Sequence, residues 1–261
     1  MDWFERIRGR RTIRQYWEQV GPQDLEDVRG LCARAVGVQG NPVRLELVPG
    51  NMVHPLCRGF IASYGKIIAP WYIAAVGGKD PQELLDLGFA GERLVLELQD
   101  LGLGSCWLGG MYDRAKAREL VDLAPDEAVQ AFIAWGIPAK ETWGAVLKKM
   151  GGLHKRKELS AILLEEQELS ETQQKIAEAV RWAPSAANQQ PWRLSFTSEG
   201  INLFSAGKGI IGHRLLLPID MGIALCHLQM ACAELGVDVT YALRPEVEHP
   251  ERDYWGTYLY K

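Results

Sequence analysis

The chain has 261 residues with a formal net charge of −4, and 47% of its residues are hydrophobic. This length and this hydrophobic content predict a globular protein with a sizeable core. The charge balance, without a long basic stripe, argues against a nucleic-acid-binding protein. No apolar run reaches membrane-spanning length, and the charged N-terminus MDWFERIRGRR is unlike a signal peptide. We therefore expect a cytoplasmic protein.

The cysteines and histidines predict neither a disulfide framework nor a metal site. The five histidines are scattered without metal-ligand spacing. The five cysteines are widely spaced and form no C-x-x-C pair, so we expect buried free thiols in a reducing compartment. They are Cys32, Cys57, Cys106, Cys226 and Cys232.

The first part of the chain alternates helix and strand patterns. A helix is predicted to begin at Pro22, because proline suits the first helical position. NPVRLELV at 41–48 alternates like a half-buried strand, and the apolar run at 67–78 reads as a buried strand. Asp80 and Glu83 have the spacing of a capping box, which predicts the start of a long helix.

The middle of the chain follows from the end of that helix. Gly102 is a plausible C-terminal glycine for it, and GLGSCWLGG at 102–110 predicts a tight, glycine-rich turn. A helix is expected near 113–122 and a strand at 128–136. A basic connector then occupies 138–160.

The last part begins with a helix after Ser170, which starts a second capping box. APSAANQQPW at 183–192 follows, and its two prolines predict a rigid, non-helical segment that presents polar groups. We expect a short strand at 194–196, a long apolar helix at 220–236 and a final aromatic strand at 253–260.

This order contains an internal repeat. NPVRLEL at 41–47 resembles QPWRLSF at 190–196, and DLGFAGERL at 86–94 resembles DMGIALCHL at 220–228. The strings recur in the same order, which favours a duplication over chance similarity. The repeat predicts two α+β halves packed about a pseudo-twofold axis, like a dimer on one chain.

We place the boundary of the halves between 1–152 and 153–261. The central helices are expected to pack closely, because small residues permit short distances between helix axes. These residues are Gly88, Ala90 and Gly91 in the first helix, and Gly222 and Ala224 in the second.

The halves differ where the polar residues gather. In the alignment of the repeat, RRTIRQY at 10–16 falls on LSAILLE at 159–165, which has no arginine. Conversely, Ser185 and Asn188 of the second half fall on Val36 and Gln39. A symmetric ancestor that kept one composite site would look like this.

Three motifs together resemble the nitroreductase family of FMN flavoenzymes. They are RRTIR at 10–14, LGLGSCWLGG at 101–110 and PSAANQQPW at 184–192. The chain resembles a branch in which one polypeptide holds two nitroreductase-like halves. The resemblance implies a nitroreductase-like fold and FMN as the cofactor. It also implies that NAD(P)H donates a hydride that passes to a small conjugated acceptor such as a nitroaromatic or a quinone.

The resemblance also assigns the parts of the FMN site. Arginines suit the phosphate, because their forked donors form charge-assisted bonds to it. A main-chain N–H of Gly109 or Gly110 is expected near the flavin N5, although this chain lacks the glutamate that many family members have before the glycine. We identify no catalytic side chain. The expected phosphate ligands are Arg10, Arg11, Thr12, Arg14, Lys155 and Arg156, and the expected neighbours of the ring and ribityl chain are Leu108, Gly109, Gly110, Pro184, Ser185, Ala186 and Asn188.

Alternative interpretations remain open from the sequence. RRTIR can be a solvated basic face and HKRK at 154–157 a surface linker. The chain lacks the Gly-x-Gly-x-x-Gly dinucleotide fingerprint, which agrees with a nicotinamide that binds only transiently on the flavin. A flavin-binding storage or sensor protein without turnover, or a scaffold that has lost FMN, are the rival functions. A duplicated chain would allow a functional monomer, with a small-molecule acceptor and with no nucleic-acid or membrane partner.

Overall fold

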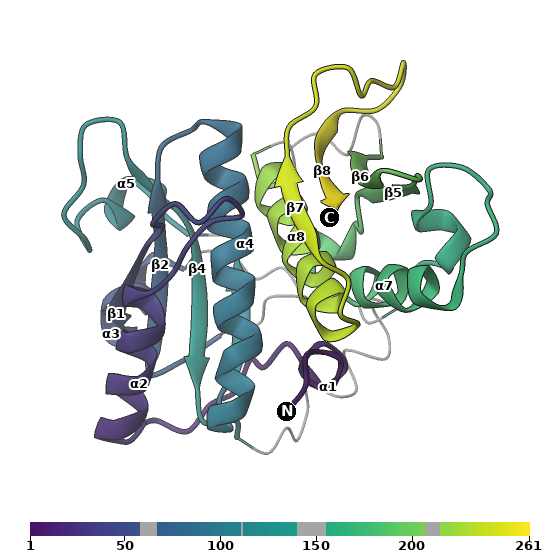
Figure 1. The fold of residues 1–261 in the computed structure, drawn as a ribbon. Helices are drawn as coiled ribbons and strands as arrows, with labels where there is room; N and C mark the ends of the chain where they lie inside the picture. Colours follow the sequence, from purple (N-terminus) through teal and green to yellow (C-terminus); the bar gives the residue numbers. More distant parts are fainter. Residues whose placement is uncertain (58–66, 111, 140–154, 207–214) are drawn as a thin grey trace.

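The computed structural model describes residues 1–57, 67–110, 112–139, 155–206 and 215–261. Two four-stranded antiparallel sheets lie on either side of a central pair of long helices, α4 and α8 (Figure 1). This is an α+β fold with two separate sheets. Among the described residues, no helix combines the length and apolar character needed to cross a bilayer.

The first sheet has the strand order β1-β2-β4-β3, and α4 packs against it. Its strands are β1 (Arg44–Pro49), β2 (Trp71–Gly77), β3 (Gly104–Leu108) and β4 (Ala128–Gly136). The helices around it are α2 (Pro22–Ala33), α3 (Gly50–Val53), η1 (His54–Leu56), α4 (Pro81–Glu97), η2 (Leu98–Leu101) and α5 (Arg114–Ala117).

The second sheet has the matching order β5-β6-β8-β7, and α7 packs against α8. Its strands are β5 (Trp192–Phe196), β6 (Gly200–Ser205), β7 (Val239–Ala242) and β8 (Tyr254–Tyr260). The remaining helices are α1 (Trp3–Gly9), η3 (Leu159–Ile162), α7 (Glu171–Arg181), η4 (Ala186–Asn188) and α8 (Leu217–Glu234).

Irregular features recur at matching places in the two sheets. The β2–β4 ladder shifts register between Ala75 and Val76, and the β6–β8 ladder shifts between Leu203 and Phe204. A β-bulge of this kind is a specific feature of a sheet and not a defect. The glycine after each long helix is left-handed as well, with φ of 69° at Gly102 and 67° at Gly236. The two sheets therefore share details beyond strand order.

The long helices cross at two glycines. A Cβ on Gly88 would lie 2.1 Å from the Ile219 carbonyl oxygen, and one on Gly222 would lie 1.9 Å from that of Leu85. Only glycine permits this approach at either position. Gly91, which we expected to face α8, lies instead against the Trp107 ring of its own half.

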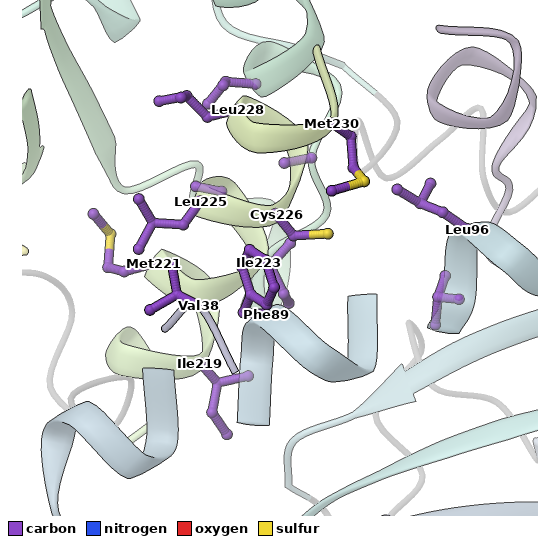
Figure 2. Close-up of a cluster of buried hydrophobic side chains, with 14 of the residues drawn as sticks. Val38, Phe89, Leu96, Ile219, Met221, Ile223, Leu225, Cys226, Leu228 and Met230 are labelled. Atoms are coloured by element: carbon purple, nitrogen blue, oxygen red, sulfur yellow. The ribbon is translucent and has the colours of Figure 1, made fainter. Parts of the chain in front are cut away.

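Helix α8 is apolar on almost every side, as expected for a helix that is buried all round. Figure 2 shows its side chains, among them Ile223, Leu225 and Met230, close to Phe89 and Leu96 of α4. All five of these side chains are buried. The core thus runs continuously across the two central helices.

The predicted starts of α2, α4 and α7 are confirmed, with one difference at α4, whereas α8 begins at Leu217, three residues before the expected start. Ser170 and Gln173 form the expected capping box at α7. Asp80 caps α4 by accepting from the Gln82 N–H at 2.9 Å. The Glu83 carboxylate, however, accepts from the Gly78 N–H at 2.8 Å and not from the N–H of the cap residue, so the expected capping box does not form at α4.

Several predicted elements differ from the structure, and some elements of the structure were not predicted. The segment 102–110 is not a tight turn, because its middle forms strand β3, which pairs with β4 and is buried. The capping box of Asp2 and Glu5 begins helix α1, which was not predicted. The apolar strand β6 and the short strand β7 were also missed. The helix expected at 113–122 shortens to α5.

Two sequence predictions concern residues outside the described part of the chain. Most of the basic connector at 138–160 lies there, and so does the boundary placed between 152 and 153. All five cysteines lie in described ranges, and none forms a disulfide. Four are buried as expected, but Cys57 is exposed.

Candidate functional site

The arginine segment at 10–14 leaves α1 and runs beside the first sheet. The Ile13 N–H donates to the Ser105 carbonyl of β3 at 2.9 Å, and Thr12 makes a parallel bridge to the same residue. α1 ends at Arg10, where the backbone turns to φ −54° and ψ 125°. Main-chain pairing therefore fixes the place of the surrounding arginines.

The three arginines of this segment have different surroundings. The Arg10 side chain is only 9% exposed, and its Nε lies 3.8 Å from Oε1 of Glu92. Burial lowers the pKa of Arg10, and the Glu92 charge partly opposes this. The Nε atoms of Arg10 and Arg14 are buried without a hydrogen-bond partner among the described residues. Arg11 is exposed, and its guanidinium donates to the carbonyls of Arg8 and, at 3.0 Å, Arg10.

The second basic segment, residues 155–157, is bound to the loop that follows α7. Arg156 donates from Nη1 to Asn188 Oδ1 at 2.7 Å and from Nη2 to the Trp182 carbonyl at 3.0 Å. The Asn188 amide in turn donates to the Lys155 carbonyl at 2.7 Å. Arg156 and Asn188 are thus held as a unit, while the Lys155 side chain is exposed.

The loop at 183–192 contains a short helical turn, so the prediction of a non-helical segment is wrong in part. After Pro184 it forms the 3₁₀ turn η4, and three of its residues have left-handed backbones: Ala187 at φ 48°, Asn188 at 55° and Gln190 at 48°. Such values are uncommon for residues with a side chain. Ser185 supports the turn, since its Oγ accepts from the Gln190 N–H at 2.8 Å.

The two basic segments approach each other. Burial lowers the pKa of Arg156 to about 10, and the positive charges of Arg10, Arg181 and Arg11 lower it further, opposed by Glu92. Arginines from the start of the chain and from beyond residue 154 therefore lie within electrostatic range. Like charges brought together in a partly buried place destabilise one another unless an anion joins them.

The end of β3 holds the three other predicted residues of the first half. Leu108 is buried in a core cluster, and only 4% of the residue is exposed. A Cβ on Gly109 would lie 2.7 Å from the Leu216 side chain. A Cβ on Gly110 would meet no atom of the described residues within 4 Å. None of these residues therefore fills the space beside Gly110 at the tip of this strand.

The first turn of helix α8 contacts both the loop at 183–192 and the tip of β3. The Ala186 N–H donates to Asp220 Oδ1 at 2.9 Å, and the Asp220 N–H donates to the Leu216 carbonyl at 2.9 Å. Burial raises the pKa of Asp220 to about 8, although the Ala186 N–H opposes the shift. The loop of the second half and the strand tip of the first half thus contact a single helical turn.

The first half contains the same carboxylate contact. Asp86 of α4 accepts from the Val38 N–H at 2.9 Å, as Asp220 accepts from the Ala186 N–H. Val38 is therefore the structural counterpart of Ala186, although the sequence alignment had placed Gly37 there. The alignment at this loop is wrong by one residue, because the carboxylate-to-amide contact fixes the correspondence.

Sequence reasoning missed three residues that hold the site together. Gln190 is nearly buried, and its Oε1 accepts from the Lys157 N–H at 2.8 Å. Asp220 anchors the loop, and Glu92 lies beside Arg10. The signal for Asp220 and Glu92 was present, since a polar residue inside a largely apolar helix needs a partner.

One groove among the described residues lies away from these segments. It has a volume of about 480 Å³ and runs between α1, α7 and the end of α8, with Phe4, Trp182 and Leu235 among its lining residues. It shares none of the 13 predicted cofactor residues. Among the described residues, no group of three or more histidine, cysteine or acidic side chains could hold a metal.

Comparison with known proteins identifies the fold. A crystal structure from Thermotoga maritima, described as "a putative nitroreductase", superposes with a TM-score of 0.66 at 25% identity, covering 100% of this chain and 93% of that one. No curated protein matches the chain significantly. The structural likeness extends over the whole molecule.

Two other solved structures match about half of the chain. An FMN-dependent nitroreductase from Clostridium difficile R20291 is 23% identical, with a TM-score of 0.46 over 53% of this chain and 89% of that one. A nitroreductase in complex with FMN from Exiguobacterium sibiricum, also titled "putative", is 14% identical, with a TM-score of 0.45 over 55% and 91%. The profile of the family described as "Putative TM nitroreductase" matches residues 2–232. The chain therefore belongs to this nitroreductase family.

Proposed function

We propose that this protein is an FMN-dependent oxidoreductase that takes reducing equivalents from NAD(P)H and delivers them to a small conjugated acceptor. The observation that carries the proposal is that Arg156, whose guanidinium donates to Asn188 Oδ1, lies within electrostatic range of Arg10. These residues come from distant parts of the chain, and each arginine keeps a buried Nε without a hydrogen-bond partner among the described residues.

The residues present fit the phosphate of FMN. A phosphate dianion would offset the mutual repulsion of the arginines and would accept from the unused Nε donors. Arg14 adds a third buried Nε, and Thr12 supplies a hydroxyl on the same segment. Lys155 and Arg11 are exposed at the edge of this cluster and would contribute charge.

The residues also fit a flat ring next to the strand tip. No described residue occupies the space beside Gly110, and Gly109 lets the main chain run close to Leu216. The Asp220 carboxylate holds the loop that contains Ser185 and Ala186 at the same turn. A backbone N–H of Gly109 or Gly110 would then be available to the ring, with Leu108 supporting the strand from the core.

Bound FMN would supply the redox chemistry, accepting a hydride from the nicotinamide and passing it to a nitroaromatic, a quinone or a similar acceptor. The protein would bind and orient the cofactor. Its arginines would stabilise the phosphate, and its main-chain donors would stabilise negative charge on the ring. We assign no side chain as a catalytic acid or base.

We also propose that the site is composite and that the chain is a pseudo-dimer of halves 1–152 and 153–261. The shared strand order, the matching bulges and the paired contacts of Asp86 and Asp220 support a duplication. On this proposal the α4–α8 contact takes the place of a subunit interface. A single chain would then hold one FMN and could act as a monomer.

The proposal is tested by anaerobic titration of the reconstituted protein with NADH and with NADPH while the flavin spectrum is recorded. We expect bound FMN to bleach with at least one nicotinamide and to recover its colour when a quinone or nitroaromatic is added.

Three other results would each exclude the proposal in a different way. Flavin that stays oxidised under an excess of both nicotinamides would leave a storage or sensor protein. Extracted FAD in place of FMN would refute the cofactor assignment. A protein that takes up no flavin after reconstitution would be a degenerate scaffold.

A further inference from the structure

A buried polar cluster joins α4 and α8 behind Arg10. The side chains of Glu92 and His227 are both 0% exposed, and His227 Nε2 lies 3.0 Å from Glu92 Oε1. The other carboxylate oxygen, Oε2, accepts from the Trp107 indole N–H at 2.8 Å. The other imidazole nitrogen, Nδ1, lies 2.9 Å from the Ala179 carbonyl of α7.

Counting donors and acceptors determines the number of protons in this cluster. A carbonyl oxygen can only accept, so the contact with Ala179 requires a proton on Nδ1 of His227. If that were the only ring proton, the Nε2 lone pair would face the lone pairs of an ionised Glu92. A second proton between Nε2 and Oε1 removes this conflict. Within the described part of the chain, neither atom has another hydrogen-bond partner, and both side chains are fully buried.

We propose that the Glu92–His227 pair holds one shared proton, is therefore electrically neutral, and thereby leaves the positive charge of Arg10 available to an anionic ligand. The net charge of the pair is zero whether the proton resides on the imidazole or on the carboxylate. Glu92 lies 3.8 Å from Arg10 Nε, beyond hydrogen-bond distance, so it positions the guanidinium without occupying its donor.

The consequence concerns selectivity between charged and uncharged ligands. Of the described residues, Glu92 and Arg11 are the charged groups that act on Arg10, and Arg156 lies in range from the second half. An unpaired Glu92 carboxylate would cancel one of these positive charges. A neutral pair keeps the cluster cationic, which favours a phosphate-bearing flavin over riboflavin. Glu92 and His227 are thus positioning residues.

The first test does not depend on any ligand. We would label histidine with ¹⁵N and record long-range ¹H–¹⁵N spectra of the wild-type protein at neutral pH. The proposal requires a proton on Nδ1 of His227 and a strongly deshielded proton in the contact between Nε2 and Glu92. Nδ1 without a proton, or no proton in that contact, would overturn it.

The second test rests on the proposed function and compares the affinity for FMN with that for riboflavin. His227→Gln removes the shared proton and leaves an ionised Glu92, so we expect FMN binding to weaken by roughly tenfold or more while riboflavin binding changes little. Glu92→Gln keeps the pair neutral, because its amide can accept from Trp107 and donate to His227. We expect this variant to change the ratio of the two affinities by less than about threefold.

The double variant separates charge from packing. Glu92→Gln combined with His227→Gln is neutral again and should recover most of the FMN preference that His227→Gln loses. A double variant as poor as, or poorer than, the His227 variant would show a merely structural role and overturn the proposal. If the wild-type protein binds neither flavin, the proposed function fails, whereas the proton count from the spectra still decides this inference.

Discussion

Two arginine side chains, those of Arg10 and Arg156, are more deeply buried than is usual for arginine. Arg10 and Arg156 lose hydration, and this loss is the first cause of the lowered pKa of each. Their Nε atoms are also buried without a hydrogen-bond partner among the described residues. A buried polar group without a partner destabilises the folded protein. We therefore expect such groups to persist where a bound ligand supplies the missing partner.

Replacing Arg10 or Arg156 with alanine should weaken FMN binding. Each lost charge-assisted bond is worth roughly 1.5–3 kcal/mol, which corresponds to about 10- to 100-fold in affinity. Titration calorimetry or flavin fluorescence measures the change. Arg29→Ala, an exposed arginine on α2, serves as the matched control and should bind like the wild type. Equal affinities for all four proteins would show that these arginines do not hold the phosphate.

Asp220 should make the free energy of unfolding depend on pH. Its pKa is raised from 3.8 to about 8 in the folded protein, so the folded state binds more protons than the unfolded state between these values. The resulting stability is complete below about pH 4 and is lost as the pH rises to about 8, with an upper limit on the order of 5 kcal/mol.

Urea unfolding at pH 5 and pH 8 tests this dependence. Asp220→Asn imitates the protonated carboxyl, so its stability should fall less than that of the wild type over this range. Asp126→Asn on the surface is the control and should follow the wild type. Identical pH profiles for wild type and Asp220→Asn would refute the shift.

At the scale of elements, the contact between α4 and α8 depends on two glycines. Each lies against a backbone carbonyl of the other helix, and backbone cannot move aside as a flexible side chain can. The same contact brings α8 close enough for its first turn to meet both Gly109 and the loop at 183–192. Helix packing and the geometry of the candidate site are therefore linked.

Gly222→Ala should destabilise the protein by about 1–3 kcal/mol or more, since its Cβ would overlap the Leu85 carbonyl. The matched control is Gly30→Ala in α2, where the new Cβ meets only a guanidinium nitrogen at 3.7 Å. That change should stabilise the helix by about 0.5–1 kcal/mol. Thermal unfolding of both variants measures the effects, and a Gly222→Ala protein as stable as the wild type would contradict the close crossing.

Elements with strong local signals could be predicted from the sequence, and elements determined by pairing could not. The strand at 128–136 and the capped start of α7 came directly from apolar run and capping chemistry. Strand β3 was mistaken for a turn because its flanking glycines dominate the local pattern. Its conformation is set by pairing with β4, which lies some 20 residues farther along the chain.

The candidate site was predictable in its parts but not in its assembly. The sequence motifs and the family resemblance named Arg10, Arg156 and Asn188. Only the fold shows that Arg156 donates to Asn188 and lies within electrostatic range of Arg10. The anchors Asp220 and Gln190 act through contacts with main-chain N–H groups of other segments. Single-sequence patterns do not encode such long-range partners.

At the scale of the whole molecule, two similar sheets enclose a shared core, and the candidate site draws on both. Arg10 lies within electrostatic range of Arg156, which donates to Asn188 in the loop at 183–192. This arrangement supports the proposed loss of one site from a symmetric ancestor. A complete site on one chain would need no partner subunit. The molar mass of the FMN-loaded protein, measured by light scattering, should then be compatible with a monomer of 29.2 kDa.

The most direct measurement is a calorimetric titration of the apoprotein with FMN and, separately, with riboflavin. We expect one FMN per chain and an affinity for riboflavin that is lower by roughly tenfold or more, because riboflavin lacks the phosphate that the arginines would bind. Two FMN molecules per chain, equal affinities for the two flavins, or no binding of FMN would contradict a single composite FMN site.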